Sequence, residues 1–166
     1  MEESSEKSFI IDTSALISLE IIEILKQVLN FNKFIISEGV LLEVEDFAQY
    51  QDFLGNKAKR ILELKSSFSI ENVQIKERIK HLQNTDNELV SLAINKQLPI
   101  ITDDMKIMRH VKNVQTFFST YFLIALITNE ALTKDEAIEK LNMLRNSRNW
   151  RDNIIYLTTL KQIQKV

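Results

Sequence analysis

The stretch that decides the fold is Leu98–His110, with the sequence LPIITDDMKIMRH. Its apolar run, Ile100–Ile101, ends abruptly on a hydroxyl and two acids, and a basic segment of helical character follows. Short apolar runs of this kind are typical of buried strands in a parallel sheet. Such sheets bind ligands just beyond the carboxyl ends of their strands. The stretch therefore predicts a buried strand that leads into a site containing Asp103 and Asp104.

The same pattern occurs near the start of the chain. Phe9–Ile11 is apolar and runs directly into Asp12, after which Ser14 can cap a helix. Two buried strands that each end in an acid favour one shared edge of a sheet. Because strand and helix patterns alternate along the chain, we expect a three-layer α/β/α fold.

The expected elements follow from periodicity and from capping signals. Strands are expected at 9–12, 34–36, 70–75, 99–101 and 114–118. Helices are expected at 15–29, 38–54, 57–64, 86–96, 105–111, 121–128 and 133–145, with helical or irregular structure after 149. Gly55 is predicted to end the second helix. Thr85 with Glu88, and Thr133 with Glu136, match the capping box that begins a helix.

Composition limits the class of protein. The chain has 166 residues, 45% of them hydrophobic and 27% charged, which fits one globular domain with a substantial core. It has no cysteine, which excludes disulfides and thiolate metal sites, and two histidines, which argues against a multi-histidine zinc site. No apolar run approaches the roughly 18 residues of a membrane span. The acidic start, MEESSEKS, is unlike a signal peptide, so we expect a cytoplasmic protein.

Charge is unevenly distributed along the chain. Residues 1–104 carry a net charge of −7 and residues 105–166 carry +5. This asymmetry fits an acidic metal site beside a basic substrate surface, although a chance split of surface charge explains it as well. Lys106, Arg109 and Lys112 recur every three residues beside the predicted site. They either hold phosphates of a nucleic acid or form a solvated helix face.

A second basic cluster lies near the C-terminus. Arg145, Arg148 and Arg151 surround Trp150. Basic groups beside an aromatic ring can bind single-stranded RNA by charge and stacking. The alternative is that the tryptophan belongs to the core and the arginines to the surface.

Two further acids fall on apolar helix faces. At 100° per residue, Glu43 projects into the same arc as Val40 and Val44, where a carboxylate needs a partner or a metal unless it reaches water at the edge. Asp86 points inward with Leu89 and its apolar neighbours. Stabilisation of the helix dipole explains its place in the first turn but not this direction.

The acids together suggest a cation site. Alternation sends Asp103 and Asp104 to different sides, and sequence alone does not decide which one faces the site. An oxygen-only ligand set suits Mg²⁺ or Mn²⁺. Such an ion can acidify a bound water and brace a phosphodiester during attack. With only Gly39 and Gly55, the chain has no glycine-rich phosphate loop.

Several segments, in order, resemble the PIN domain, a small metal-dependent ribonuclease module. They are FIIDTSALI, VLLEV and NTDNELVSLAINKQLPIITDDMKI, the last holding two acidic positions. The resemblance covers about residues 8–130 and implies a mostly parallel, five-stranded sheet between helices. The whole chain, 1–166, is then one domain with a helical extension over 131–166. Residues 47–84 match no family motif.

The resemblance also implies roles for individual residues. The quartet that binds metal and catalyses is Asp12, Glu43, Asp86 and Asp104. Asp104 is preferred to Asp103 because the family pattern places the acid two residues after a threonine, here Thr102. Thr13 and Ser14 match small hydroxyl residues that support the acids.

The function implied is a Mg²⁺- or Mn²⁺-dependent endoribonuclease. The resemblance extends to VapC-type toxins, which implies a small antitoxin as partner. It also implies a homodimer. The alternatives are a PIN nuclease of rRNA or tRNA processing without an antitoxin, and a catalytically silent PIN-like module that binds RNA or protein. A receiver-type domain is a further alternative, but no lysine ends a strand after Asp104.

Overall fold

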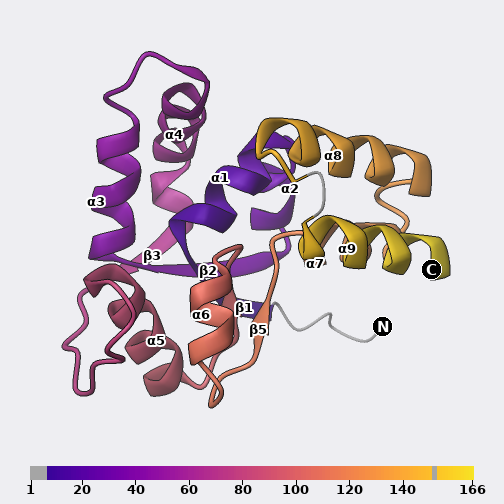
Figure 1. Cartoon of the computed structure of the whole chain (residues 1–166). Coiled ribbons are helices and arrows are strands. Elements are labelled where there is room, and N and C mark those ends of the chain that lie inside the picture. The colour runs from indigo at the N-terminus through magenta and orange to yellow at the C-terminus, as the bar shows by residue number, and fades with distance from the viewer. Residues whose placement is uncertain (1–6, 151–152) are drawn as a thin grey trace.

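A parallel sheet lies at the centre of the molecule (Figure 1). The computed structural model describes residues 7–150 and 153–166. Within them the chain forms one five-stranded sheet of parallel strands. The strands are β1 Lys7–Ile11, β2 Asn32–Ser37, β3 Phe68–Glu71, β4 Ile100–Ile101 and β5 Thr116–Phe117. The expected parallel sheet is thus confirmed, with the third strand two residues earlier than its pattern predicts.

The strand order identifies where a ligand would bind. The strands lie in the order β3-β2-β1-β4-β5, so the chain moves outward from β1 to β3 and then returns to the other side of β1. Ile10 pairs with Ile100 and Ile11 with Ile101. The strand order therefore reverses between β1 and β4. Open parallel sheets bind their ligands at such a switch point, beyond the carboxyl ends of the strands.

Helices cover both faces of the sheet and confirm the three-layer architecture (Figure 1). They are α1 Thr13–Ile21, α2 Leu25–Leu29, α3 Glu38–Phe47, α4 Phe53–Glu63, α5 Asn84–Lys96, α6 Met105–His110, α7 Tyr121–Thr128, α8 Lys134–Ser147 and α9 Ile154–Lys165, with a 3₁₀ turn at Lys65–Ser67. In the C-terminal extension, α8 and α9 lie side by side (Figure 1). No helix of the described residues has the length and apolarity to span a bilayer.

The core is a single cluster of apolar side chains, centred on the sheet. Phe9 of β1 and Phe34 of β2 both meet the ring of Phe122 from α7, each with 5.4 Å between ring centroids. Such edge-to-face contacts favour a fixed arrangement of the rings. The ring of Phe122 therefore belongs to the core, where it packs α7 against β1 and β2.

The first predicted helix is interrupted. Periodicity predicts one helix over 15–29, whereas the structure has α1 and α2 with a break around Glu23. This residue has a φ of 58°. A left-handed residue cannot continue a right-handed helix, and the chain bends there. Without a glycine or proline, the sequence gives no signal for the break.

The prediction that Gly55 ends a helix is wrong. Helix α3 ends at Phe47, and Gly55 lies in the first turn of α4, where its N–H donates to the capping carboxylate of Asp52 at 2.7 Å. A Cβ at this position would overlap the carbonyl oxygen of Tyr50. The glycine is needed here for close approach of the backbone, not for a helix terminus.

The start of α5 also differs from its prediction. The helix begins at Asn84, and Asp86 rather than Glu88 completes the cap, by accepting a hydrogen bond from the N–H of Gln83 at 3.0 Å. Glu88 instead accepts from the N–H of Gly39 at 3.2 Å, which joins α5 to α3. Asn87 lies in the first turn of α5, and its buried side chain forms hydrogen bonds with the backbone of residues 79–83, which precede the helix. By contrast, the capping box of Thr133 and Glu136 is confirmed at the start of α8.

Candidate active site

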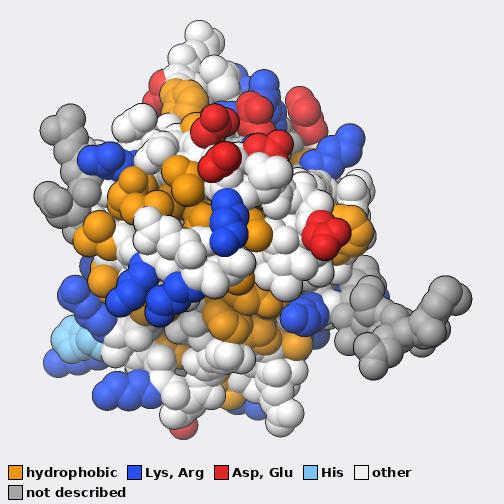
Figure 2. Space-filling model, turned by 90° about the vertical axis from the view of Figure 1, so that its right-hand side faces the viewer, with side chains coloured by type: hydrophobic (Ala, Val, Ile, Leu, Met, Phe, Trp, Pro, Cys, Tyr) orange, Lys and Arg blue, Asp and Glu red, His pale blue; other side chains and the backbone are white. Residues whose placement is uncertain are grey.

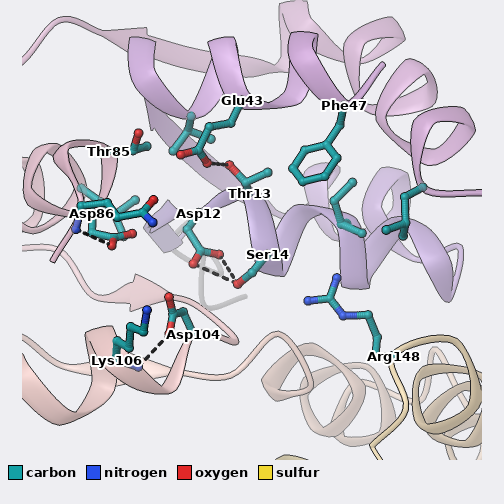
Figure 3. Close-up of a pocket in the computed structure, with 15 residues that line it drawn as sticks. Asp12, Thr13, Ser14, Glu43, Phe47, Thr85, Asp86, Asp104, Lys106 and Arg148 are labelled. Carbon is teal, nitrogen blue, oxygen red and sulfur yellow. Dashed lines mark hydrogen bonds between the residues drawn. The ribbon is translucent and has the colours of Figure 1, made fainter. Parts of the chain in front are cut away.

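A pocket opens beyond the carboxyl ends of β1 and β4. Its volume is about 240 Å³. Four of the predicted acids, from four different segments, lie on its wall with two basic side chains and several apolar ones (Figure 3). The lining residues are Asp12, Thr13, Ser14, Ile17, Val40, Glu43, Phe47, Leu54, Gln83, Thr85, Asp86, Leu89, Asp104, Lys106 and Arg148.

Asp12 is the most deeply buried of these acids. It caps α1 by accepting from the N–H of Ala15 at 2.8 Å. The hydroxyl of Ser14 donates to both of its oxygens at 2.9 Å, and the hydroxyl of buried Thr102 donates at 2.5 Å. Burial nevertheless raises the pKa of Asp12 to about 7. The hydrogen bonds oppose this rise only in part.

Glu43 approaches the pocket from α3. It is half-buried, and its carboxylate accepts a hydrogen bond from the hydroxyl of Thr13 at 2.6 Å. Thr13 and Ser14, adjacent in sequence, thus each hold a different acid. The short polar run after β1 orients two carboxylates on the same pocket wall (Figure 3).

Asp86 has two roles in the structure. One oxygen accepts from Gln83 as part of the helix cap, and the side chain also lines the pocket. Burial raises the pKa of Asp86, and the negative charges of Asp104 and Glu43 raise it further. Asp86 therefore stabilises the start of α5 and also faces the pocket, where it lies within electrostatic reach of Asp104 and Glu43.

The structure separates the two neighbouring aspartates. Asp104 caps α6, accepting from the N–H of Lys106 at 2.7 Å, and lines the pocket. Asp103 is not on the pocket wall. Its carboxylate accepts from the N–H and the hydroxyl of Ser119, at 2.9 and 2.8 Å, at the start of the segment leading to α7. Burial raises the pKa of Asp103 as well.

Thr102 and Asp103 support the site from behind. Thr102 is buried, donates to Asp12 and accepts from the N–H of Asp104 at 3.0 Å. The N–H of Asp103 donates to the hydroxyl of Ser14 at 3.0 Å. The loops after β1 and β4 are therefore bound to each other through hydroxyl groups, which fixes Asp12 relative to Asp104.

Only one of the three periodic basic residues reaches the pocket. Lys106 lines it, whereas Arg109 and Lys112 are exposed and do not. On the face drawn in Figure 2, acidic side chains gather near the top and most lysines and arginines lie below them. Of the three, Lys106 is therefore the residue that can contact a phosphate in the pocket.

The C-terminal cluster divides into three roles. Trp150 is 7% exposed and belongs to the core, and the guanidinium of Arg145 lies over the ring of Tyr156 at 5.2 Å. Arg151 lies outside the described residues. Arg148, at the end of α8, lines the pocket. The sequence shows Arg148 in a basic cluster but carries no signal that α8 brings it to the acids.

A family model described as the PIN domain matches residues 8–165 of this sequence. The chain belongs to the PIN-domain family. The match extends well beyond residue 130, so α8 and α9 lie within the family's span. No curated protein matches the sequence.

Two solved structures show the same fold as this PIN domain. PAE2754 from Pyrobaculum aerophilum is similar with a TM-score of 0.56 and 17% identity, covering 74% of this chain and 90% of that one. VapBC2 from Rickettsia felis, solved bound to a DNA fragment from its promoter, is similar with a TM-score of 0.50 and 16% identity, covering 67% and 98%. At these identities the likeness establishes the fold alone.

The acids suit a hard divalent cation in their chemistry. The donors are carboxylate oxygens, which Mg²⁺ and Mn²⁺ prefer, and their mutual repulsion would be relieved by a positive ion. In the described parts of the chain, however, no three His, Cys, Asp or Glu side chains are arranged to hold one ion. Each of these acids is instead turned toward a protein donor. The donor set fits the ion, but the side chains are not already closed around a common centre.

Proposed function

We propose that this PIN-domain protein is a Mg²⁺- or Mn²⁺-dependent endoribonuclease that hydrolyses phosphodiester bonds in RNA. The observation that carries the proposal is the pocket at the switch point, where Asp12, Glu43, Asp86 and Asp104 meet beside Lys106. Acids of this kind destabilise one another unless a cation is present. A phosphate is attracted only where positive charge offsets theirs.

The residues divide the work by their environment. Asp12, Glu43, Asp86 and Asp104 would hold the ion, and the hydroxyls of Thr13, Ser14 and Thr102 would keep two of these acids in place. A divalent cation bound there would offset the charge of the attacked phosphate and acidify a water molecule. The ammonium of Lys106 would bind a phosphate oxygen of the substrate.

A cleavage assay tests the proposal. A labelled pool of randomised single-stranded RNA is incubated with the protein in Mn²⁺, in Mg²⁺ and in EDTA, beside DNA of the same design. We expect cleavage of RNA with either ion and none in EDTA. Glu43→Gln should lower the rate at least about 100-fold. Glu45→Gln, at a half-buried acid of the same helix that does not line the pocket, should leave it unchanged. Cleavage that persists in EDTA would contradict the proposal.

A second candidate is a catalytically silent binding module. It is favoured by the absence, among the described residues, of three acids arranged for one ion. The same assay separates the two, because a silent module binds RNA or protein without metal-dependent cleavage. The nuclease is preferred because all four acids line one pocket, which a binding surface does not require.

The biological role is a narrower proposal. VapBC2 was solved bound to promoter DNA, and its fold likeness supports a toxin neutralised by a small antitoxin in the cytoplasm. Induced expression should then arrest growth, and Asp104→Asn should abolish the arrest. Growth that continues with a folded, RNA-cleaving protein would favour a processing nuclease of rRNA or tRNA. We also expect the protein to form a homodimer, which analytical ultracentrifugation would detect as a species of twice the mass of the chain.

A further inference from the structure

An aromatic and a basic side chain of the pocket, Phe47 and Arg148, form no hydrogen bond with its acids. Phe47 ends α3, and Arg148 follows the last residue of α8, so they come from elements far apart in the sequence. Figure 3 shows both on one side of the acids, with Lys106 on the other side. We propose that Phe47 and Arg148 form a nucleotide subsite, in which the aromatic ring stacks on a base and the guanidinium binds the adjoining phosphate of a single RNA strand. This inference rests on the proposed function, because it assigns the substrate's path across the same pocket.

The position of Arg148 favours a phosphate ligand. Its side chain is half-buried on the pocket wall, yet it forms no hydrogen bond or ion pair with another described residue. Arg145, three residues earlier, instead packs on Tyr156. A half-buried guanidinium that forms no hydrogen bond within the described residues offers a planar fork of donors, which suits phosphate oxygens. The charge of Arg148 also lowers the pKa of Asp103, so the two groups interact electrostatically.

The position of Phe47 favours a base. Its side chain is 40% exposed although it lies on the pocket wall with Leu54 and Leu89. Exposed aromatic rings beside basic groups are the usual stacking platforms for unpaired bases. Phe53, an exposed aromatic residue of α4, does not line the pocket. A pocket of about 240 Å³ does not hold a duplex, so the proposed subsite suits a single strand.

The two contacts predict different signatures. Loss of a phosphate contact lowers the salt dependence of binding, because fewer counterions are released from the RNA. Loss of a stacking contact lowers affinity without changing that dependence. A change that merely disturbed the fold would not separate these two effects, and thermal unfolding of each variant reports the fold independently.

The test is fluorescence anisotropy of a labelled, randomised 12-nucleotide RNA, titrated in EDTA at several salt concentrations. Arg148→Gln should weaken binding about tenfold and reduce the slope of log K against log salt by about 0.7. Arg148→Lys should recover the slope. Phe47→Leu should weaken binding about tenfold with the slope unchanged. The matched controls, Arg145→Gln and Phe53→Leu, should bind as the wild type does.

The outcomes separate this inference from the nuclease proposal. Binding by Arg148→Gln and Phe47→Leu that equals the wild type, with an equal slope, would overturn the subsite. So would a wild type that binds no RNA in EDTA, because neither contact needs a metal. Metal-dependent cleavage is scored separately. If the wild type cleaves RNA but Arg148→Gln keeps the wild-type RNA affinity and salt slope, the subsite alone is rejected. If the variants show the expected changes in binding but the wild type does not cleave RNA, the nuclease alone is rejected.

Discussion

Replacing Asp12 with asparagine should make the free energy of unfolding of the metal-free protein less dependent on pH. The pKa of this acid rises from 3.8 to about 7 in the fold because it is buried. Between these values the folded chain binds one proton more than the unfolded chain. Stability from this group is therefore complete below about pH 4 and is lost as the pH rises to about 7. A shift of this size corresponds to about 4 kcal/mol in the free energy of unfolding.

The variant adds a second effect that does not depend on pH. An asparagine oxygen can still accept from the N–H of Ala15, but an amide NH₂ would face the hydroxyl of Thr102, which now donates to the acid. An unsatisfied buried pair of this kind costs about 1–3 kcal/mol at every pH. The two proteins are therefore compared by the difference between their free energies of unfolding, and the informative result is how this difference changes with pH. Asp86 titrates in both proteins and cancels, whereas Asp103, whose negative charge raises the pKa of Asp12, contributes to the trend.

Urea unfolding in EDTA, followed by the fluorescence of buried Trp150, measures this difference from pH 4 to pH 8. We expect it to move in favour of Asp12→Asn by up to about 4 kcal/mol as the pH rises. A saturating divalent cation should abolish this trend in the wild type, because it favours the ionised acid. A difference that stays constant over this range would refute the account of Asp12.

Three further predictions concern the fold around the pocket. Gly55→Ala should destabilise the protein by about 1–3 kcal/mol, because the added Cβ would meet the backbone of Tyr50. Gly39→Ala should destabilise it less, because the flexible side chain of Glu88 can move away from the added Cβ. Thermal unfolding of the two variants measures this difference. Asn87→Ala should expose residues 79–83 to proteolysis, and cleavage there no faster than in the wild type would argue against its bracing role. Phe122→Ala should cost about 3–5 kcal/mol in chemical unfolding, and a loss below about 1 kcal/mol would contradict its packing against Phe9 and Phe34.

The strands and the acids at their ends were predictable from sequence because both follow from local order. An apolar run that stops on an aspartate reports a buried strand and the edge where it ends, as at Asp12 and Asp104. The choice between Asp103 and Asp104 was not local. It depends on Ser119, which lies 16 residues further along the chain and donates two hydrogen bonds to the carboxylate of Asp103.

The other misses have the same origin. The break at Glu23 and the close approach at Gly55 depend on the backbone path between packed helices, which periodicity does not report. Arg148 reaches the pocket only because α8 packs beside α1 and ends there. A charge in a distant helix gives no sequence signal for such a place, whereas the acids next to strands do.

The most direct test of the central claim is calorimetric titration of the protein with Mn²⁺ at pH 7.5, on the wild type, Asp104→Asn and the control Glu45→Gln. The account predicts that the wild type and Glu45→Gln bind the ion alike. Asp104→Asn, verified as folded by circular dichroism, should bind at least about tenfold more weakly. A folded wild type that binds no Mn²⁺, or an Asp104→Asn protein that binds it as tightly as the wild type, would contradict a carboxylate metal site in this pocket.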